Sequence, residues 1–173
     1  MTYPFHYAMN NPEIVNQLQQ GNRKALARCI SIVENEAAGY IDILSSLSIN
    51  GSTPLVGITG PPGAGKSTLL NSIIKELLNE NTGIQIAVVA VDPTSPFTKG
   101  SLLGDRLRMA EHFNNEHVYI RSLATRGALG GLAGRMVEIT DVMRSANFDF
   151  IFVETVGVGQ SEVEIASLAD TTI

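Results

Sequence analysis

The sequence of 173 residues has no tryptophan, one cysteine and fewer basic than acidic side chains. The single cysteine, Cys29, excludes a disulfide within one chain and any metal cluster held by several cysteines of that chain. Twelve Lys and Arg residues stand against 17 Asp and Glu residues, which gives a formal net charge of −5. Because a broad nucleic-acid-binding face needs clustered positive charge, we expect no nucleic-acid partner.

Long apolar runs and targeting signals are also lacking. The longest uninterrupted apolar run covers residues 86–91, whereas a helix needs about 20 such residues to cross a bilayer. The first basic residue is Arg23, so the N-terminus has neither the basic start of a secretory signal nor an arginine-rich transit helix. These absences predict a cytoplasmic protein with no membrane partner.

Glycine is plentiful and unevenly distributed. Eleven of the 16 glycines lie in four short stretches, at residues 60–65, 100–104, 127–134 and 157–159. Glycine lets the backbone turn with positive φ or approach a ligand closely, so these clusters indicate shaped loops rather than general flexibility. With 44% hydrophobic and 17% charged residues, the chain has enough apolar side chains for a buried core.

Residues 11–50 have the apolar spacing of helices. Asn11 and Asn22 are suitable helix starts, because an Asn side chain caps the free amides of a first turn. After Asn22, apolar side chains recur at intervals of three and four residues and share one helical face: Leu26, Cys29, Ile30 and Val33. Cys29 is therefore expected to be a buried structural thiol. A second helical stretch is predicted around residues 40–47.

From residue 54 onward, strand and helix patterns alternate. Short apolar runs, typical of strands in a parallel sheet, cover residues 55–59, 84–91, 118–121 and 148–154. Helical stretches are predicted at residues 67–79, 105–113, 132–145 and 162–169. This order predicts a three-layer α/β/α fold around a mostly parallel sheet. We expect an N-terminal helical extension over residues 1–50 and an α/β domain over residues 51–173.

One motif in the α/β region has specific chemistry. Residues 60–67, GPPGAGKS, match the phosphate-binding loop (P-loop) pattern G-x-x-x-x-G-K-[ST] and predict a P-loop NTPase fold. The glycines let backbone amides turn toward phosphates, and the following helix directs its positive end at the same anion. Lys66 supplies charge for the β- and γ-phosphates, and Ser67 a hydroxyl for Mg²⁺. The predicted nucleotide-binding residues here are Gly60, Pro61, Pro62, Gly63, Ala64, Gly65, Lys66, Ser67 and Thr68.

Carboxylates near strand ends are candidate metal ligands. Glu154 ends one apolar run, as a Walker-B-type acid does, and Asp92 directly follows another. The stretch ETVG that begins at Glu154 has the D-x-x-G spacing of a nucleotide switch, with Glu in place of Asp. Gly157 is therefore expected to present its amide to the γ-phosphate. Asp105 follows a glycine-bracketed loop and either caps the next helix or joins the metal site.

Three arginines, Arg108, Arg121 and Arg126, lie in or beside loops that are expected to face the phosphates. Any of them would stabilise transition-state charge as an internal arginine finger does, and each has the alternative role of a surface or partner contact. No side chain is clearly placed as a general base. We therefore expect slow intrinsic hydrolysis by an in-line water, with charge neutralised by Mg²⁺, Lys66 and backbone amides.

Taken together, these stretches resemble the MeaB/ArgK-type P-loop GTPases, relatives of the human methylmalonic aciduria type A protein. Older labels call such proteins LAO/AO transport system kinases. The resemblance runs over residues 12–173 and is most specific at residues 154–162, ETVGVGQSE. It also includes VDPTSP at residues 91–96, GSLLGD at residues 100–105 and TRGALGG at residues 125–131.

The resemblance implies a Mg²⁺-dependent GTPase that binds GTP and GDP. Such a protein acts as a chaperone that gates and protects cofactor loading of a B12 (cobalamin)-dependent acyl-CoA mutase such as methylmalonyl-CoA mutase. The implied metal-site residues are Ser67, Asp92, Asp105 and Glu154. The catalytic set is Lys66, Asp92, Asp105, Glu154 and Arg108.

The C-terminal half of the resembled family is not matched. No Asn-Lys-x-Asp guanine-reading motif follows Lys66, and residues 170–173 look like the start of a further strand. We therefore expect a G domain truncated at its C-terminus, without the family's dimer-forming segment. The full-length protein is expected to form a homodimer.

Three other classes fit the sequence less well. A GTPase metallochaperone for nickel enzymes needs Cys and His ligands near its switches, whereas Cys29 is alone and His6, His112 and His117 show no ligand spacing. A partitioning ATPase has lysine directly after the first P-loop glycine, where this sequence has Pro61. A small-molecule kinase would need a phosphoacceptor site or lid, and the sequence shows neither. The nickel metallochaperone and the small-molecule kinase stay as alternatives to the mutase chaperone.

Overall fold

A computed structural model describes residues 11–92, 109–124, 131–155 and 160–173. In these ranges, five strands form one sheet in the order β3-β2-β4-β1-β5, and every neighbouring pair is parallel. The strands are β1 (Leu55–Ile58), β2 (Ile86–Asp92), β3 (Val118–Ala124), β4 (Phe150–Thr155) and β5 (Thr171–Thr172). The predicted α/β fold with a mostly parallel sheet is confirmed.

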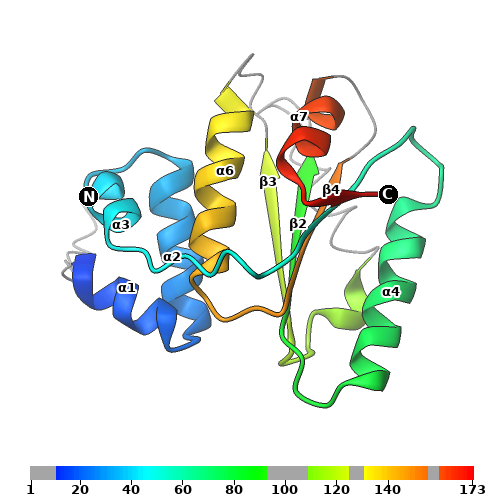
Figure 1. Ribbon diagram of the computed structural model, residues 1–173, viewed down its shortest axis with the longest axis horizontal. Coiled ribbons are helices and arrows are strands. Elements are labelled where there is room, and N and C mark those ends of the chain that lie inside the picture. The colour runs from blue at the N-terminus through cyan, green and yellow to red at the C-terminus, as the bar shows by residue number, and fades with distance from the viewer. Residues whose placement is uncertain (1–10, 93–108, 125–130, 156–159) are drawn as a thin grey trace, which may run out of the picture.

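Helices cover both faces of the sheet. Helix α4 (Lys66–Glu80) lies on one face, and α6 (Gly131–Arg144) and α7 (Gln160–Leu168) lie on the other (Figure 1). Right-handed crossovers that run in opposite directions along a parallel sheet must lie on opposite faces. The β1-to-β2 crossover through α4 runs one way, and the crossovers through α6 and α7 run the other way. The layer arrangement therefore follows from the strand order.

Alternation along the central strands divides the core into two parts. In β2, Ile86 and Val88 pack on the α4 side, whereas Ala87, Val89 and Val91 pack on the α6 side. Each of these five side chains is less than 2% exposed, because both faces of β2 are covered. A continuous apolar run is the pattern that such a doubly covered strand requires.

Three short helices precede the sheet: α1 (Asn11–Gln19), α2 (Arg23–Glu34) and α3 (Tyr40–Ser45). The predicted helix start at Asn22 is confirmed, because its side-chain oxygen accepts hydrogen bonds from the amides of Lys24 and Ala25 at 3.0 and 3.1 Å. The predicted apolar face of α2 is buried, and Cys29 is 0% exposed within it. None of the helices in the described ranges has the length and apolar composition to cross a membrane.

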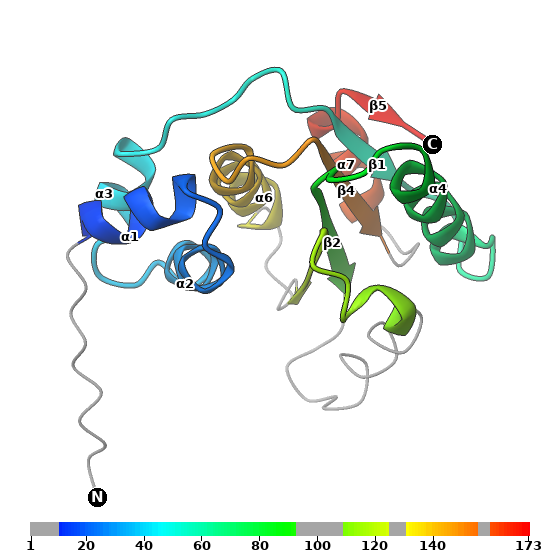
Figure 2. The same cartoon turned by 90° about the horizontal axis from the view of Figure 1, so that it is seen from below.

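The N-terminal helices share a hydrophobic core with the sheet. Leu26 and Ile30 of α2 belong to the same buried cluster as Met136 and Ile139 of α6 and Val89 of β2. Figure 2 shows α2 beside α6, with α1 and α3 on the outer side away from the strands. The boundary between residues 1–50 and 51–173 stays a prediction, and the packing across it is continuous.

Two local predictions differ from the structure. The helix expected at residues 105–113 begins outside the described residues, and within them this stretch contains only the 3₁₀ helix η1 (Ala110–His112). The strand expected at residues 118–121 extends to Ala124. It is longer because β3 pairs with β2 in unbroken register, from Ile86↔Val118 to Asp92↔Ala124, although Arg121 and Ser122 interrupt its apolar run.

A glycine in β1 permits close packing of α7 on the sheet. A Cβ atom added at Gly57 would lie 3.1 Å from Cγ2 of Ile165 and 3.2 Å from Cβ of Ala169. These distances are shorter than ordinary van der Waals contacts, so a larger residue here would push α7 away from β1.

We predict that Leu26→Ala lowers the free energy of unfolding by about 2–5 kcal/mol, because the substitution leaves a cavity in a fully packed core. The matched control is Ile41→Ala, since Ile41 is 58% exposed and its truncation is expected to cost less than about 0.5 kcal/mol. Urea unfolding is followed by far-UV circular dichroism and by tyrosine fluorescence. A Leu26→Ala protein that lost its N-terminal helices while the sheet kept its parent stability would contradict the shared core.

Candidate functional site

The candidate site lies where three neighbouring strands end. β4 lies between β2 and β1 in the sheet, and its Glu154 is in register with Ala90 of β2 and Ile58 of β1. The P-loop begins two residues after Ile58 and leads into α4. In parallel α/β sheets, ligands bind at the carboxyl ends of the strands, so the topology brings the P-loop and Glu154 to that edge.

The P-loop backbone has the shape of an anion cradle. Gly63 and Gly65 have φ values of +80° and +88°, which favour glycine over residues that carry a side chain. Gly65 is the N-cap of α4, so the free amides of the first helical turn point into the loop. A helix start of this kind, after a glycine-rich turn, favours negative charge through both its amides and its dipole.

Lys66 is held over the loop by the loop's own carbonyls. Its Nζ donates hydrogen bonds to the carbonyl oxygens of Gly60 at 2.7 Å and Pro61 at 3.0 Å. An ammonium group has three N–H donors, so two of them fix its position and the third is available to a phosphate oxygen. The positive charge is thereby placed beside the cradle before any anion binds.

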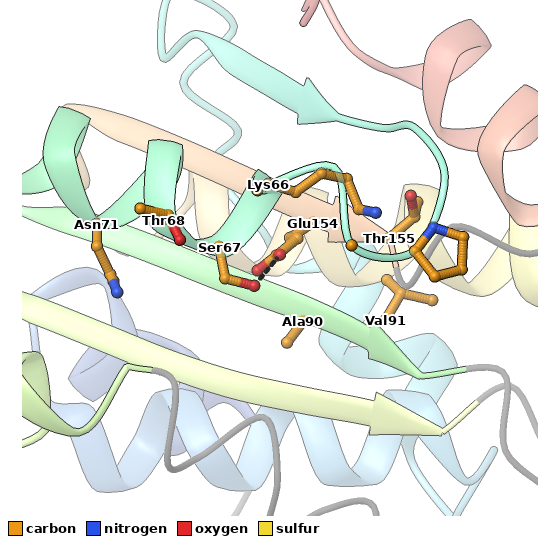
Figure 3. A pocket seen from close by; sticks show the side chains of 11 residues that line it. Lys66, Ser67, Thr68, Asn71, Ala90, Val91, Glu154 and Thr155 are labelled. Carbon is orange, nitrogen blue, oxygen red and sulfur yellow. Dashed lines mark hydrogen bonds between the residues drawn. The ribbon is translucent and has the colours of Figure 1, made fainter.

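Ser67 and Glu154 come together from opposite sides of the site. Ser67 Oγ donates a hydrogen bond to Glu154 Oε1 at 2.5 Å, and Figure 3 shows the two side chains pointing toward one another. Glu154 is 8% exposed, so its carboxyl group is held largely out of solvent at the end of β4. A hydroxyl and a carboxylate are hard oxygen donors of the kind that Mg²⁺ prefers, so these residues fit the metal that the sequence predicts.

A cavity of about 400 Å³ connects these groups. Ser67 and Asn71 enter it from one face of α4, because residues four apart on a helix are neighbours on its surface. The described residues that line it are Pro62, Gly63, Gly65, Lys66, Ser67, Thr68, Asn71, Ala90, Val91, Glu154 and Thr155. Backbone amides and Lys66 make one side suited to an anion, and Glu154 makes the other suited to a cation. A metal–phosphate ligand has this distribution of charge.

The structure describes only part of the predicted site. Six of the nine predicted nucleotide-binding residues at 60–68 line the cavity. The other three do not line it: the carbonyls of Gly60 and Pro61 accept hydrogen bonds from Lys66, and the amide of Ala64 donates to the carbonyl of Pro61. Asp92 is the last residue of β2 and pairs with Ala124 of β3. It lies two residues after Ala90, which pairs with Glu154, and it is not among the residues that line the cavity. The remaining predictions fall outside the described residues: Asp105, Arg108, Arg126 and Gly157.

Of the two roles considered for Arg121, the structure does not support the arginine finger, because the side chain points away from the P-loop. Its Nη2 pairs with Oε2 of Glu34 at 2.7 Å and also donates to Oγ of Ser31 at 3.2 Å. Both partners belong to α2, on the face of the sheet opposite α4. The sequence did not indicate this direction, because the face that each β3 side chain takes depends on the register of β3 with β2 and on where α2 packs.

Sequence reasoning did not identify four residues that line the cavity. Asn71 lies one helical turn after Ser67, and Thr155 follows Glu154 directly. Ala90 and Val91 line the cavity from β2. The four-residue helical spacing from Ser67 is the signal that would have found Asn71. Ala90 and Val91 have no such signal, because a small apolar strand residue looks the same in a core and in a cavity wall.

Among the described residues, Cys29, His112 and His117 belong to no group that could hold a metal ion. No group of three His, Cys, Asp or Glu side chains in the described ranges is arranged to hold a metal ion. Cys29 is fully buried, and burial raises the pKa of its thiol to about 11, with a smaller opposing effect from Arg28. A thiol with this pKa is protonated near neutral pH, which fits a structural role.

The sequence of this chain matches a known protein family. The family described as "Methylmalonyl Co-A mutase-associated GTPase MeaB" matches residues 26–173, which is most of the chain. The chain belongs to the MeaB family of GTPases. The MeaB match includes the P-loop, Glu154 and all the strands described above.

Curated relatives support the same assignment. The chain is 50% identical over 162 residues to a GTPase of Pyrococcus abyssi, covering 93% of this chain and 49% of that protein. It is 40% identical over 166 residues to GTPase ArgK of Escherichia coli, covering 93% of this chain and 50% of that protein. A third relative, the fused isobutyryl-CoA mutase of Geobacillus kaustophilus, is 36% identical over 168 residues, which cover 92% of this chain and 15% of that protein.

A solved structure shares the fold. The crystal structure of an LAO/AO transport system kinase superposes with a TM-score of 0.71 at 32% identity, covering 94% of this chain and 48% of that one. The chain thus spans about half the length of the two GTPase relatives and of this structure. The MeaB-type fold of the matched half is shown by sequence and structure together.

Proposed function

We propose that the protein binds GTP and GDP together with Mg²⁺ and hydrolyses GTP. The observation that carries this proposal is the P-loop cradle whose Ser67 is hydrogen-bonded to Glu154 at the end of β4. Membership of the MeaB family supports guanine as the base. The cytoplasmic location, the homodimer and the two-region division at residue 50 stay predictions of the sequence.

Catalysis in this proposal depends on positioning and electrostatics. Amides at the start of α4 and the ammonium of Lys66 hold the phosphates and offset negative charge that develops in the transition state. A bound Mg²⁺ would supply further neutralisation of phosphate charge. Ser67 and Glu154 would hold it, directly or through water, from α4 and β4. The buried position of Glu154 strengthens these interactions, because fewer waters compete with them.

The partner that we propose is a B12-dependent acyl-CoA mutase, which the GTPase would protect and gate during cofactor loading. The family's description refers to association with methylmalonyl-CoA mutase, and one relative is a fused isobutyryl-CoA mutase. A fused arrangement supports a working contact between a domain like this one and a mutase, because fusion keeps the two at high effective concentration.

We predict that Lys66→Ala lowers the rate of GTP hydrolysis at least about 100-fold, because it removes the cation placed over the phosphate cradle. The matched control is Lys75→Ala, which removes an exposed lysine of the same helix away from the cavity. Release of inorganic phosphate is measured for both variants and the parent. Turnover by Lys66→Ala at the parent rate would refute the proposed active site.

A second prediction concerns the metal. Glu154→Gln keeps the shape of the side chain but removes its charge, so we expect the apparent Mg²⁺ affinity to fall about 10–100-fold. Binding of a fluorescent GDP analogue is measured across a Mg²⁺ titration and with EDTA, which separates metal from nucleotide affinity. Glu76→Gln, an exposed change on α4, is the control. The same Mg²⁺ dependence in Glu154→Gln and parent would show that Glu154 does not hold the metal.

A third prediction concerns the mutase. The native-length protein is expected to co-elute with purified methylmalonyl-CoA mutase, and the amount bound should differ between GDP and a non-hydrolysable GTP analogue. This difference between the two nucleotides is expected to disappear in Lys66→Ala, because that variant lacks the cation that binds the phosphates. Absence of any complex in both nucleotide states would reject the mutase as the partner while leaving the GTPase proposal intact.

A further inference from the structure

A second polar site lies at the opposite end of the sheet, around Arg23. This residue begins α2, and its guanidinium lies 5.7 Å from the ring centre of Tyr119 and 5.2 Å from that of Phe148. Its Nη2 donates to Oε1 of Gln85 at 2.7 Å and to the carbonyl oxygen of Glu116 at 2.9 Å. These contact residues lie at or just before the amino ends of β2, β3 and β4, whereas the P-loop lies at the carboxyl ends.

The guanidinium is held in one orientation. Gln85, which accepts its hydrogen bond, is itself fixed, because its Nε2 lies 2.8 Å from Nδ1 of His117 and its backbone amide donates to Oδ2 of Asp149 at 2.7 Å. The two aromatic rings add cation–π contacts. A planar guanidinium that is already fixed loses little conformational freedom when it binds an acceptor.

The charge of Arg23 is not neutralised by an acid. In the part of the chain that the structure describes, no Asp or Glu forms an ion pair with it. Burial lowers the pKa of this guanidinium, with a smaller opposing effect from Tyr119. The residue is only partly buried, so an anion from solvent can reach its guanidinium.

The guanidinium of Arg23 also has N–H donors that make no hydrogen bond within the described residues. A guanidinium has five N–H donors, and both hydrogens of Nη2 are used. The three donors on Nη1 and Nε have no acceptor among the described residues. Donors arranged in a rigid fork match the two oxygens of a carboxylate.

A cavity of about 290 Å³ adjoins Arg23. Leu26, Ala146 and Phe148 give it a buried apolar wall, and Gln20 and Asn147 place amide groups at its exposed side. The wall is anchored, because Nδ2 of Asn147 donates to the carbonyl oxygen of Gln19 at 2.7 Å. This volume is near the lower end of the range for small-molecule sites, which is roughly 300–1,000 Å³.

We propose that this cavity is a second ligand site, which binds a small carboxylate with an apolar tail. The carboxylate accepts hydrogen bonds from the open donors of Arg23, and the tail lies against the apolar wall. A phosphate group fits less well, because the first-turn amides of α2 that phosphate sites use are already bonded to the side chain of Asn22. The site is separate from the nucleotide site and does not depend on the function proposed for it.

The test is an NMR titration with butyrate that follows the Nε–Hε signal of Arg23, assigned by its loss in Arg23→Met. We expect a saturable shift in the parent protein. Gln20→Glu places a negative charge at the cavity without touching the contacts of Arg23, so butyrate affinity is expected to fall about tenfold. The matched control is Asn79→Asp, a change of equal charge at an exposed residue of α4 outside the cavity lining, which is expected to bind like the parent.

Three outcomes would overturn the proposal: no saturable shift with butyrate, the same affinity in Gln20→Glu as in the parent, or an equal response to phosphate or chloride at matched ionic strength. If Arg23→Met does not fold, Arg23→Lys, which keeps the positive charge, supplies the assignment by the same loss of signal. Gln20→Glu leaves the packing around Arg23 intact, so the affinity comparison does not depend on either variant. Lys66→Ala is expected to bind butyrate as the parent does, which separates this site from the GTPase proposal.

Discussion

Parallel pairing of β1 with β4 is the constraint on which the candidate site depends. The register Ile58↔Glu154 joins segments almost a hundred residues apart and fixes the carboxylate of Glu154 beside the start of α4. Because side chains alternate along a strand, a shift of one residue would turn Glu154 to the other face, away from Ser67. Val153 and Phe152 are buried on opposite faces of the sheet, so such a shift would also expose core side chains. The register that packs the core is therefore the same register that places Glu154 beside Ser67.

The N-terminal helices and the sheet share one hydrophobic core. The apolar face of these helices completes the core on the α6 side, and two polar contacts add to it. Arg121, in the middle of β3, pairs with Glu34 of α2, and Arg23 of α2 bonds to Gln85 just before β2.

The acidic net charge is compatible with two anion sites of different construction. At the P-loop, backbone amides and one lysine provide local positive potential, so the net charge of −5 does not oppose phosphate binding at short range. At the other end of the sheet, the guanidinium of Arg23, held beside the rings of Tyr119 and Phe148, is proposed to provide it. Neither site needs a broad basic surface, because a few preorganised donors act over short distances where solvent screens poorly.

Local sequence was sufficient to predict the helix start at Asn22, the apolar face of α2, the P-loop and the parallel α/β class, because each depends on neighbours within a few residues. The MeaB resemblance was also read from motifs. The sequence could not predict the length of β3, the direction of Arg121 or the surroundings of Arg23. Those features depend on the pairing of β3 with β2 and on where α2 packs, which are contacts between residues far apart in the chain. Tertiary structure therefore decided which polar side chains meet, since strand register and helix packing set their directions.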